Sequence, residues 1–201
     1  MTVALQLPDA FGDDGARDFV AGSTEDRILN ATLRLLARRG VRRLGMQEVS
    51  EAAGVSRGTL YRYFPSKDHL LAAMAVHDEQ RFTNGLTLAL ASATEPVERI
   101  EALVAYAFDY IRTHPARALF ASEPEFVLGY LLMHLPKLHA ALLEQLGDAF
   151  DTVPAVVLGH VTRDQLVDVV VRLFTSSFII PEPDDRTLVQ SINGILLLAK
   201  S

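Results

Sequence analysis

The sequence predicts an all-α protein, and three observations support this expectation. Apolar residues recur three or four positions apart along nearly the whole chain, which is the period of an amphipathic helix. Alternating apolar and polar runs, which would indicate strands, are almost absent. Capping residues, glycines and prolines stand where such helices would begin and end. A small N-terminal helical unit followed by a larger helical domain is therefore expected.

The first helix is expected from Glu25 to Arg39, with Ser23 or Thr24 as its cap and Gly40 in a left-handed conformation after its end. Two short helices and a long one follow, to about Leu90. The next helix begins at Thr94 and stops before Pro115. The remaining segments are a helix pair broken at Pro136 (Glu123 to His134, Lys137 to Phe150), a loop marked by Pro154 and Gly159, and two final helices (about Arg163 to Ile180, and Asp184 to Lys200).

Composition excludes several classes of protein. The 201 residues contain no cysteine, so disulfides, thiolate zinc sites and cysteine nucleophiles are excluded. Residues 1–22 form an acidic, Gly/Asp/Ala-rich arm without the features of a signal peptide. Because no run of 18 apolar residues occurs, we expect no contact with a membrane and a cytoplasmic location.

Charge is distributed unevenly along the chain. The net charge is −6, yet Thr24 to His69 holds nine basic and five acidic residues, so this stretch carries +4 and the rest carries −10. Such an asymmetry marks where a polyanion could dock, although a solvated helix face would give the same count.

The segment Met46 to Phe64 has the pattern of a helix-turn-helix. Val49 and Ala53 lie on one face of a short helix, Gly54 supplies the positive φ of a tight turn, and Ser56 caps a second helix. In that second helix Leu60 faces inward together with Tyr63 or Phe64. An ordinary helical hairpin that contains a glycine is the alternative, but spacing, capping and local charge agree on the first interpretation. We therefore expect a DNA-binding domain at residues 23–70 and a second domain at 71–201.

The run Gly54-Val-Ser-Arg-Gly-Thr-Leu-Tyr-Arg-Tyr-Phe-Pro-Ser-Lys-Asp-His-Leu70, within Thr24 to Met74, resembles the DNA-binding domain of the TetR family. The resemblance implies that the residues facing bases or the nearby backbone are Gln47, Arg57, Gly58, Thr59 and Tyr61, and that Tyr63 and Lys67 hold phosphates. One departure stands before the first short helix, where Gly45 and Met46 replace the usual Ser or Thr cap.

The resemblance also implies a ligand chamber and a dimer interface in the second domain. Bulky residues on the helices expected around a chamber are Phe82, Leu86, Phe108, Ile111, Phe120, Phe126, Tyr130, Met133 and Phe174, with Tyr130 as a polar handle. Because few charges interrupt these helices, we expect a small lipophilic effector, fatty-acid-like or steroid-like. Simple core packing is the alternative for each of these residues.

The last two helices carry apolar stripes that would form a four-helix bundle between two subunits. The residues expected at this interface are Leu166, Val170, Leu173, Leu188, Ile192, Ile195 and Ala199. Both stripes would look the same if they belonged to the internal core.

No catalytic signature occurs, and the spacing of His134 and His139 does not suit a metal, so we expect no enzyme, cofactor or metal site. The sequence thus predicts a homodimeric repressor that binds a palindromic DNA operator and is released by its effector. The alternatives are an activator, because the sign of regulation depends on where the operator lies, and an architectural DNA-binding protein without an effector. An enzyme that uses the apolar chamber is a further alternative, but it would need a polar constellation that the sequence does not show.

Overall fold

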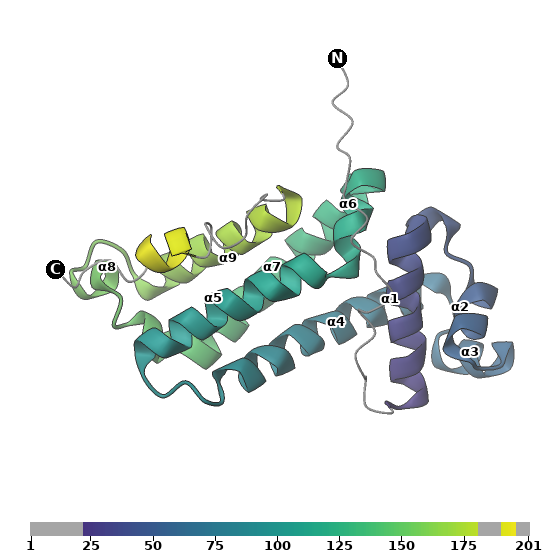
Figure 1. Ribbon diagram of the computed structural model, residues 1–201. Helices are drawn as coiled ribbons and strands as arrows, with labels where there is room; N and C mark the ends of the chain where they lie inside the picture. Colours follow the sequence, from purple (N-terminus) through teal and green to yellow (C-terminus); the bar gives the residue numbers. More distant parts are fainter. Residues whose placement is uncertain (1–21, 181–189, 196–201) are drawn as a thin grey trace, which may run out of the picture.

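The computed structural model describes residues 22–180 and 190–195, and these residues form helices and no strand (Figure 1). The elements are α1 (Thr24–Arg43), α2 (Met46–Ala53), α3 (Arg57–Tyr63), α4 (Lys67–Leu90), α5 (Pro96–Thr113), the 3₁₀ turn η2 (Pro115–Ala118), α6 (Leu119–Ser122), α7 (Pro124–Phe150), α8 (Pro154–Val157) and α9 (Arg163–Ile179). Residues 190–195 are also helical. The predicted all-α class is confirmed.

The N-terminal unit consists of α1, α2 and α3. Ser23 caps α1 in a capping box with Asp26, and Gly40 adopts φ 77°, as its place in the sequence predicts. The helix resumes after Gly40 and runs to Arg43, so it is longer than predicted and kinked at this glycine. Gly54, with φ 64°, ends α2 in the left-handed conformation, and the hydroxyl of Ser56 accepts a hydrogen bond from the Thr59 amide at the start of α3.

A small apolar core holds these three helices together. Val49 and Leu60 are fully buried against Ile28 and Leu36 of α1. Between the two candidates that the sequence leaves open at the end of α3, Phe64 is the buried one, whereas Tyr63 is 40% exposed. The aromatic ring of Tyr63 is thus available to a partner outside the chain.

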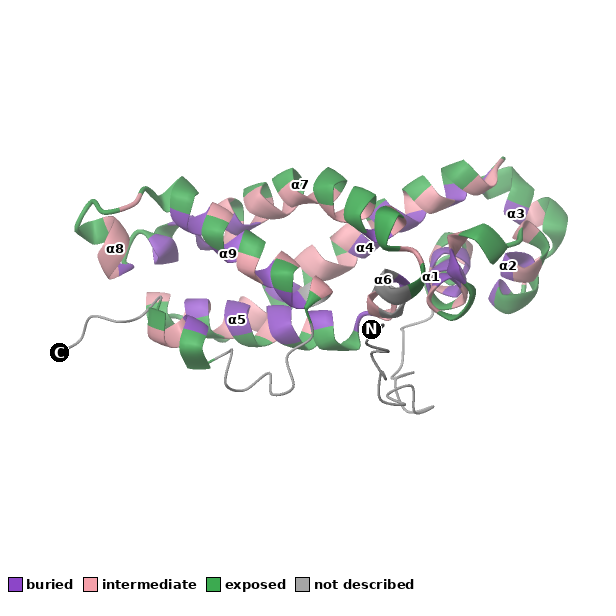
Figure 2. Cartoon of the chain, turned by 90° about the horizontal axis from the view of Figure 1, so that it is seen from above, coloured by how far each residue is buried: buried purple, intermediate pink, exposed green. Residues whose placement is uncertain are grey.

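The helix α4 leads from this unit into the rest of the chain and crosses residue 70, where the sequence places the domain boundary (Figure 1). It packs against α1, α5 and α7, and α9 packs in turn on α5 and α7. Figure 2 shows that the buried residues of α5 and α9 line their inner sides. One apolar core runs through both parts, from Ile28 in α1 to Phe174 in α9.

The predicted break at Pro136 is wrong, because α7 runs unbroken from Pro124 to Phe150 with this proline inside it. Proline removes one backbone donor and crowds the carbonyl four residues earlier, here that of Leu132. Both Leu132 and Pro136 are on the exposed side of the helix, where water can satisfy the released carbonyl. The interruption therefore costs less than it would on the buried side.

The helix α7 is also long and apolar enough to cross a membrane by length and composition alone, with a mean hydropathy of 1.4 in its most apolar window. Only 11% of that window is buried within the chain, and Leu128, Leu132 and Met133 are about half exposed or more. The same helix packs against α4, α5 and α9. One side of it thus contributes to the helical core, while the other side presents apolar surface.

The last predicted helix, Asp184 to Lys200, is described only at residues 190–195. Of the interface residues expected on it, Ile192 and Ile195 are placed, whereas Leu188 and Ala199 lie outside the described residues.

Candidate functional site

The outer surface of α3 carries most of the side chains expected to read DNA. Arg57, Gly58 and Tyr61 are exposed, and Thr59 is half-buried with its hydroxyl 2.8 Å from that of Ser56. The guanidinium of Arg62 lies over the ring of Tyr63, 5.6 Å from its centre. The first turn of α3 carries no acidic residue, so its positive end does not repel a phosphate. The site therefore has the residues and charge that a major groove requires.

Two further residues expected at the DNA have partners within the chain. The exposed side chain of Gln47 donates to Glu51 Oε1 at 3.0 Å. The ammonium group of Lys67 donates to the carbonyl of Val41, at the end of α1. Lys67 thus joins the start of α4 to the end of α1, which is a structural role that the sequence pattern did not reveal.

Arg27 is a second basic residue with a structural role. Its Nη2 donates to the carbonyls of Ala53 and Gly54 at 2.8 and 2.9 Å, so α1 holds the turn between α2 and α3 in place. Arg39 pairs with Glu48 at 2.6 Å. These two arginines contribute to the positive count of the segment, but their guanidinium groups are engaged within the unit. Exposed arginines nearby are Arg34, Arg38, Arg42 and Arg43.

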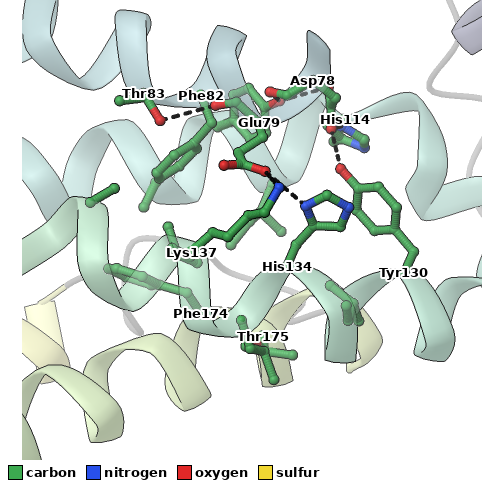
Figure 3. Close-up of a pocket in the computed structure, with 17 residues that line it drawn as sticks. Asp78, Glu79, Phe82, Thr83, His114, Tyr130, His134, Lys137, Phe174 and Thr175 are labelled. Carbon is green, nitrogen blue, oxygen red and sulfur yellow. Dashed lines mark hydrogen bonds and ion pairs between the residues drawn. The ribbon is translucent and has the colours of Figure 1, made fainter. Parts of the chain in front are cut away.

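A second site lies among α4, α5, α7 and α9, where the lining surface of a partly open cavity of about 110 Å³ is mostly apolar (Figure 3). Its lining consists of Asp78, Glu79, Phe82 and Thr83 from α4; Ala107, Tyr110 and Ile111 from α5, with His114 after it; Tyr130, Leu131, His134, Leu135, Lys137, Leu138 and Ala141 from α7; and Phe174 and Thr175 from α9.

Asp78 is the centre of a buried polar cluster at this cavity. Its carboxylate accepts hydrogen bonds of 2.8 Å from Tyr110 Oη, Tyr130 Oη and His114 Nε2, and Arg81 lies 3.8 Å away. Burial raises the pKa of Asp78, but the charge of His114 and the three hydrogen bonds outweigh it and lower the pKa to about 2. Asp78 is therefore ionised in the folded protein.

Burial and the charge of Asp78 raise the pKa values of Tyr110 and Tyr130 far above the ordinary tyrosine range. Both hydroxyls consequently stay protonated and remain hydrogen-bond donors to the carboxylate.

The neighbouring Glu79 forms a second polar group at the cavity. Its Oε2 accepts from His134 Nδ1 at 3.0 Å and from Lys137 Nζ at 2.9 Å (Figure 3). Burial raises the pKa of Glu79, whereas the hydrogen bonds from Lys137 and His134 and the charge of Lys137 lower it, and the net effect is a lowered pKa. The other ring nitrogen of His134, Nε2, is buried and has no hydrogen-bond partner.

The structure brings together some of the residues expected in the chamber and separates others. Phe82, Ile111, Tyr130 and Phe174 line the cavity. Phe126 lines a smaller adjoining hollow, whereas Leu86 and Phe108 are buried in the core and do not line the cavity, although the ring of Phe108 packs against that of Phe174. Met133 is 70% exposed, so its expected place in the chamber is wrong, because it lies on the outer side of α7. The side chain of Phe120 lies outside what the structure describes.

Sequence reasoning missed the polar half of the lining. Asp78, Glu79 and His114 are charged or polar residues that a search for bulky apolar side chains passes over. One signal was available: Asp78 falls on the same helix face as the apolar residues Met74 and Leu70, four and eight positions earlier. A carboxylate on a buried stripe needs partners, and it therefore indicates a polar site.

The residues expected at the dimer interface divide into those that are buried within the chain and those that are exposed. Val170 is fully buried and Leu166 is 8% exposed within this one chain, so they face the core and the prediction of an interface role is wrong for them. Leu173 of α9 is half-buried. In residues 190–195, Ile192 is 3% exposed and faces the core as well, whereas Ile195 is 68% exposed. The outward side of α9 instead carries Val169, which is 52% exposed. Apolar residues thus occur on both sides of α9, and the part of this helix that would face a second chain stays a prediction.

Within residues 22–180 and 190–195 no group of three or more His, Asp or Glu side chains could hold a metal ion.

A helix-turn-helix with a basic outer surface, joined by one long helix to a helical domain with an internal cavity, defines a transcriptional regulator of the helix-turn-helix class. Comparison with known proteins gives the family. Residues 28–74 match the family model of "Bacterial regulatory proteins, tetR family". An uncharacterised HTH-type transcriptional regulator of Mycobacterium tuberculosis is 31% identical over 171 residues, which cover 82% of this chain and 80% of the relative. The chain belongs to the TetR family.

Two further similarities are informative. The HTH-type transcriptional repressor KstR of Mycolicibacterium smegmatis is 38% identical over 102 residues, covering 51% of this chain and 48% of the relative. The crystal structure of AibR in complex with isovaleryl coenzyme A and operator DNA matches with a TM-score of 0.57 and 18% identity, over 87% of this chain and 98% of that one. This last likeness shows the fold.

Proposed function

We propose that this TetR-family regulator is a ligand-responsive repressor, which binds a palindromic operator in the cytoplasm as a homodimer and leaves it when a small, mainly apolar effector binds. One observation supports the proposal above the others: α4 begins directly after the recognition helix α3, and its fourth turn carries Asp78 and Glu79 at the wall of the cavity. A change in the cavity therefore acts on the helix that positions α3.

Operator binding would rest on the exposed side chains of α3, with Arg57 as the main reader of a base edge. Two copies of α3 in a dimer would enter successive major grooves about 34–36 Å apart. An effector that prefers another arrangement of α4 would change this spacing, and it can shift the equilibrium only by its difference in affinity for the two states.

The apolar effector is supported by the lining of the cavity, in which Phe82, Leu135 and Phe174 are typical members. The cavity of about 110 Å³ is smaller than the ~300–1,000 Å³ of pockets that hold drug-sized ligands. A steroid or long-chain acid would therefore need the helices to separate, whereas a short molecule needs no such movement. The AibR complex, with coenzyme A ester and operator DNA together, supports the pairing of the two sites in this fold.

The homodimer would use the outward sides of α9 and α7. Val169 on α9 and Leu128, Leu132 and Met133 on α7 form apolar surface on two helices that pack against each other. Exposed apolar patches of this kind mark interfaces between chains. Burial in a second copy would also account for the high hydropathy of α7.

Selection from a random duplex library at moderate salt tests the proposal. The expected result is an enriched palindrome with half-sites about one helical turn apart, bound by two chains. A pool that binds at low salt without any enriched sequence would overturn the repressor function and favour an architectural protein. Enrichment of a single half-site by a monomer would overturn the dimer and leave the DNA-binding function in place.

A further inference from the structure

The cavity wall indicates which chemical class of effector it takes, an inference that rests on the proposed ligand-responsive function. The donors on the lining are already directed at the two carboxylates. Tyr110, Tyr130 and His114 donate to Asp78, while His134 and Lys137 donate to Glu79. The hydroxyls of Thr83 and Thr175 donate to the backbone carbonyls of Glu79 and Val171 at 3.0 and 2.8 Å.

Lys137 keeps two further N–H donors, but its side chain is half exposed and these donors can reach water. On the other side chains the hydrogen-bonding capacity that is left is mainly that of acceptors. Each threonine hydroxyl that donates to a carbonyl keeps its own lone pairs. His134 is more specific: because Nδ1 faces an ionised carboxylate that can only accept, Nδ1 carries the proton in the neutral ring, and Nε2 is then an acceptor. This Nε2 is buried without a partner. A buried polar atom without a partner costs free energy that a suitable ligand would recover.

Charge at the wall acts against an anionic ligand. Asp78 and Glu79 are both ionised, and the cations next to them are already hydrogen-bonded to them. A ligand carboxylate placed in the cavity would meet two like charges, of which that of Asp78 is buried. An ammonium group would find both carboxylates already neutralised by their partners. A neutral group that donates a hydrogen bond meets neither obstacle.

We propose that the effector is a small, uncharged, mainly apolar molecule with a hydroxyl group, and that this hydroxyl donates to His134 Nε2. The cavity of about 110 Å³ limits the part of the ligand that enters it to a short aliphatic chain or a small ring. For scale, an apolar cavity of about 150 Å³ holds benzene. Tyr130, whose ring centre lies 4.5 Å from that of His134, would cover the imidazole on one side.

Two isomers test the hydroxyl directly. n-Pentanol and butyl methyl ether have the same atoms, but only the alcohol can donate a hydrogen bond. Pentanoate adds the anionic case. Binding of each is followed by NMR titration of the full-length protein at pH 8, which favours the neutral imidazole ring. The imidazole ¹⁵N signals of His134 report on the proposed contact.

Pentanol should bind about fivefold or more tightly than the ether, as expected of one neutral hydrogen bond, and it should shift the Nε2 signal of His134. In His134→Phe the two isomers should bind alike, whereas His139→Phe, on the same helix but outside the cavity lining, should keep the preference. The comparison of isomers in the unaltered protein stands even if the His134 variant does not fold.

Equal binding of the alcohol and the ether, tighter binding of pentanoate, or no binding of any probe would each overturn this assignment. None of these results touches operator binding, which the duplex selection measures separately. A failure of the ligand class is therefore distinguishable from a failure of the repressor function.

Discussion

The carboxylate of Glu123 accepts a hydrogen bond from the backbone N–H of Arg42 at 3.3 Å. Glu123 is the N-cap residue of α7, whose later turns line the cavity, and Arg42 lies in the last turn of α1. The contact is possible because Gly40 leaves the space that Glu123 occupies. The start of α7 thus connects the cavity to the DNA-binding unit, in addition to the connections through α4 and through η2, which also pack against α1.

Gly40→Ala should break this second connection. The substitution places a side chain at φ 77° and presses its Cβ against Glu123 Oε1, so we expect a loss of about 1–3 kcal/mol in the free energy of unfolding. The Arg42 amide should also exchange its hydrogen faster, because its acceptor is displaced. Urea unfolding and amide exchange measure the two effects.

Gly129→Ala is the matched control for that variant, since Gly129 lies within α7 with open space around its Cβ position. It should be neutral or stabilise the protein by up to about 1 kcal/mol. If Gly40→Ala were as stable as this control, the hydrogen bond between Glu123 and the Arg42 amide would not depend on Gly40.

Asp78→Asn should destabilise the protein in a pH-dependent way. The folded-state pKa of Asp78, about 2, lies below the ordinary value of 3.8, so its contribution is complete above that ordinary value and is lost as pH falls toward 2. The shift corresponds to about 2 kcal/mol. Urea unfolding of both proteins should show a difference of this order at pH 6, which shrinks as the pH approaches 2. A difference that is the same at every pH would show that the charge of Asp78 has no part in stability.

Arg57→Ala and Lys67→Ala should affect DNA binding differently. Arg57 is exposed on α3, and its loss should cost about 1–3 kcal/mol of binding free energy on the preferred sequence and relax the choice of one base.

In Lys67→Ala the slope of log K for DNA binding against log salt concentration should be smaller by about one unit if the ammonium of Lys67 reaches a phosphate. Because this ammonium also donates to the Val41 carbonyl, Lys67→Ala should lower the free energy of unfolding by about 1 kcal/mol as well. An unchanged slope with reduced stability would assign Lys67 to the α1–α4 contact alone.

The sequence predicts local features well where a residue type has one physical use. Gly40 and Gly54 have the positive φ that their positions require, and Ser23 and Ser56 cap the helices that follow them. Which side of a helix faces the core was harder to predict. Val170 and Val169 are equally apolar neighbours on α9, yet the first is buried and the second exposed.

The site could be predicted only in part, because its polar members are brought together by tertiary structure. Asp78 and His114 are 36 positions apart, and no local pattern shows that they form an ion pair at 2.8 Å. Pro136 shows the opposite problem. A proline inside a helix predicts a break, but α7 continues through Pro136, which lies on the exposed side of the helix. The DNA-binding function could be predicted more easily than the arrangement of the cavity, because the helix-turn-helix lies in one continuous segment of the sequence.

Whether the cavity controls operator binding is measured most directly by the Kd for the selected operator, with and without an organic extract of the cells that make the protein. The unaltered chain is compared with Ala141→Phe, in which a ring fills the cavity. The extract should raise the Kd of the unaltered chain about tenfold, within the usual range of allosteric coupling, and leave that of the variant unchanged. If the extract left both Kd values unchanged, or raised both equally, the cavity would not control operator binding.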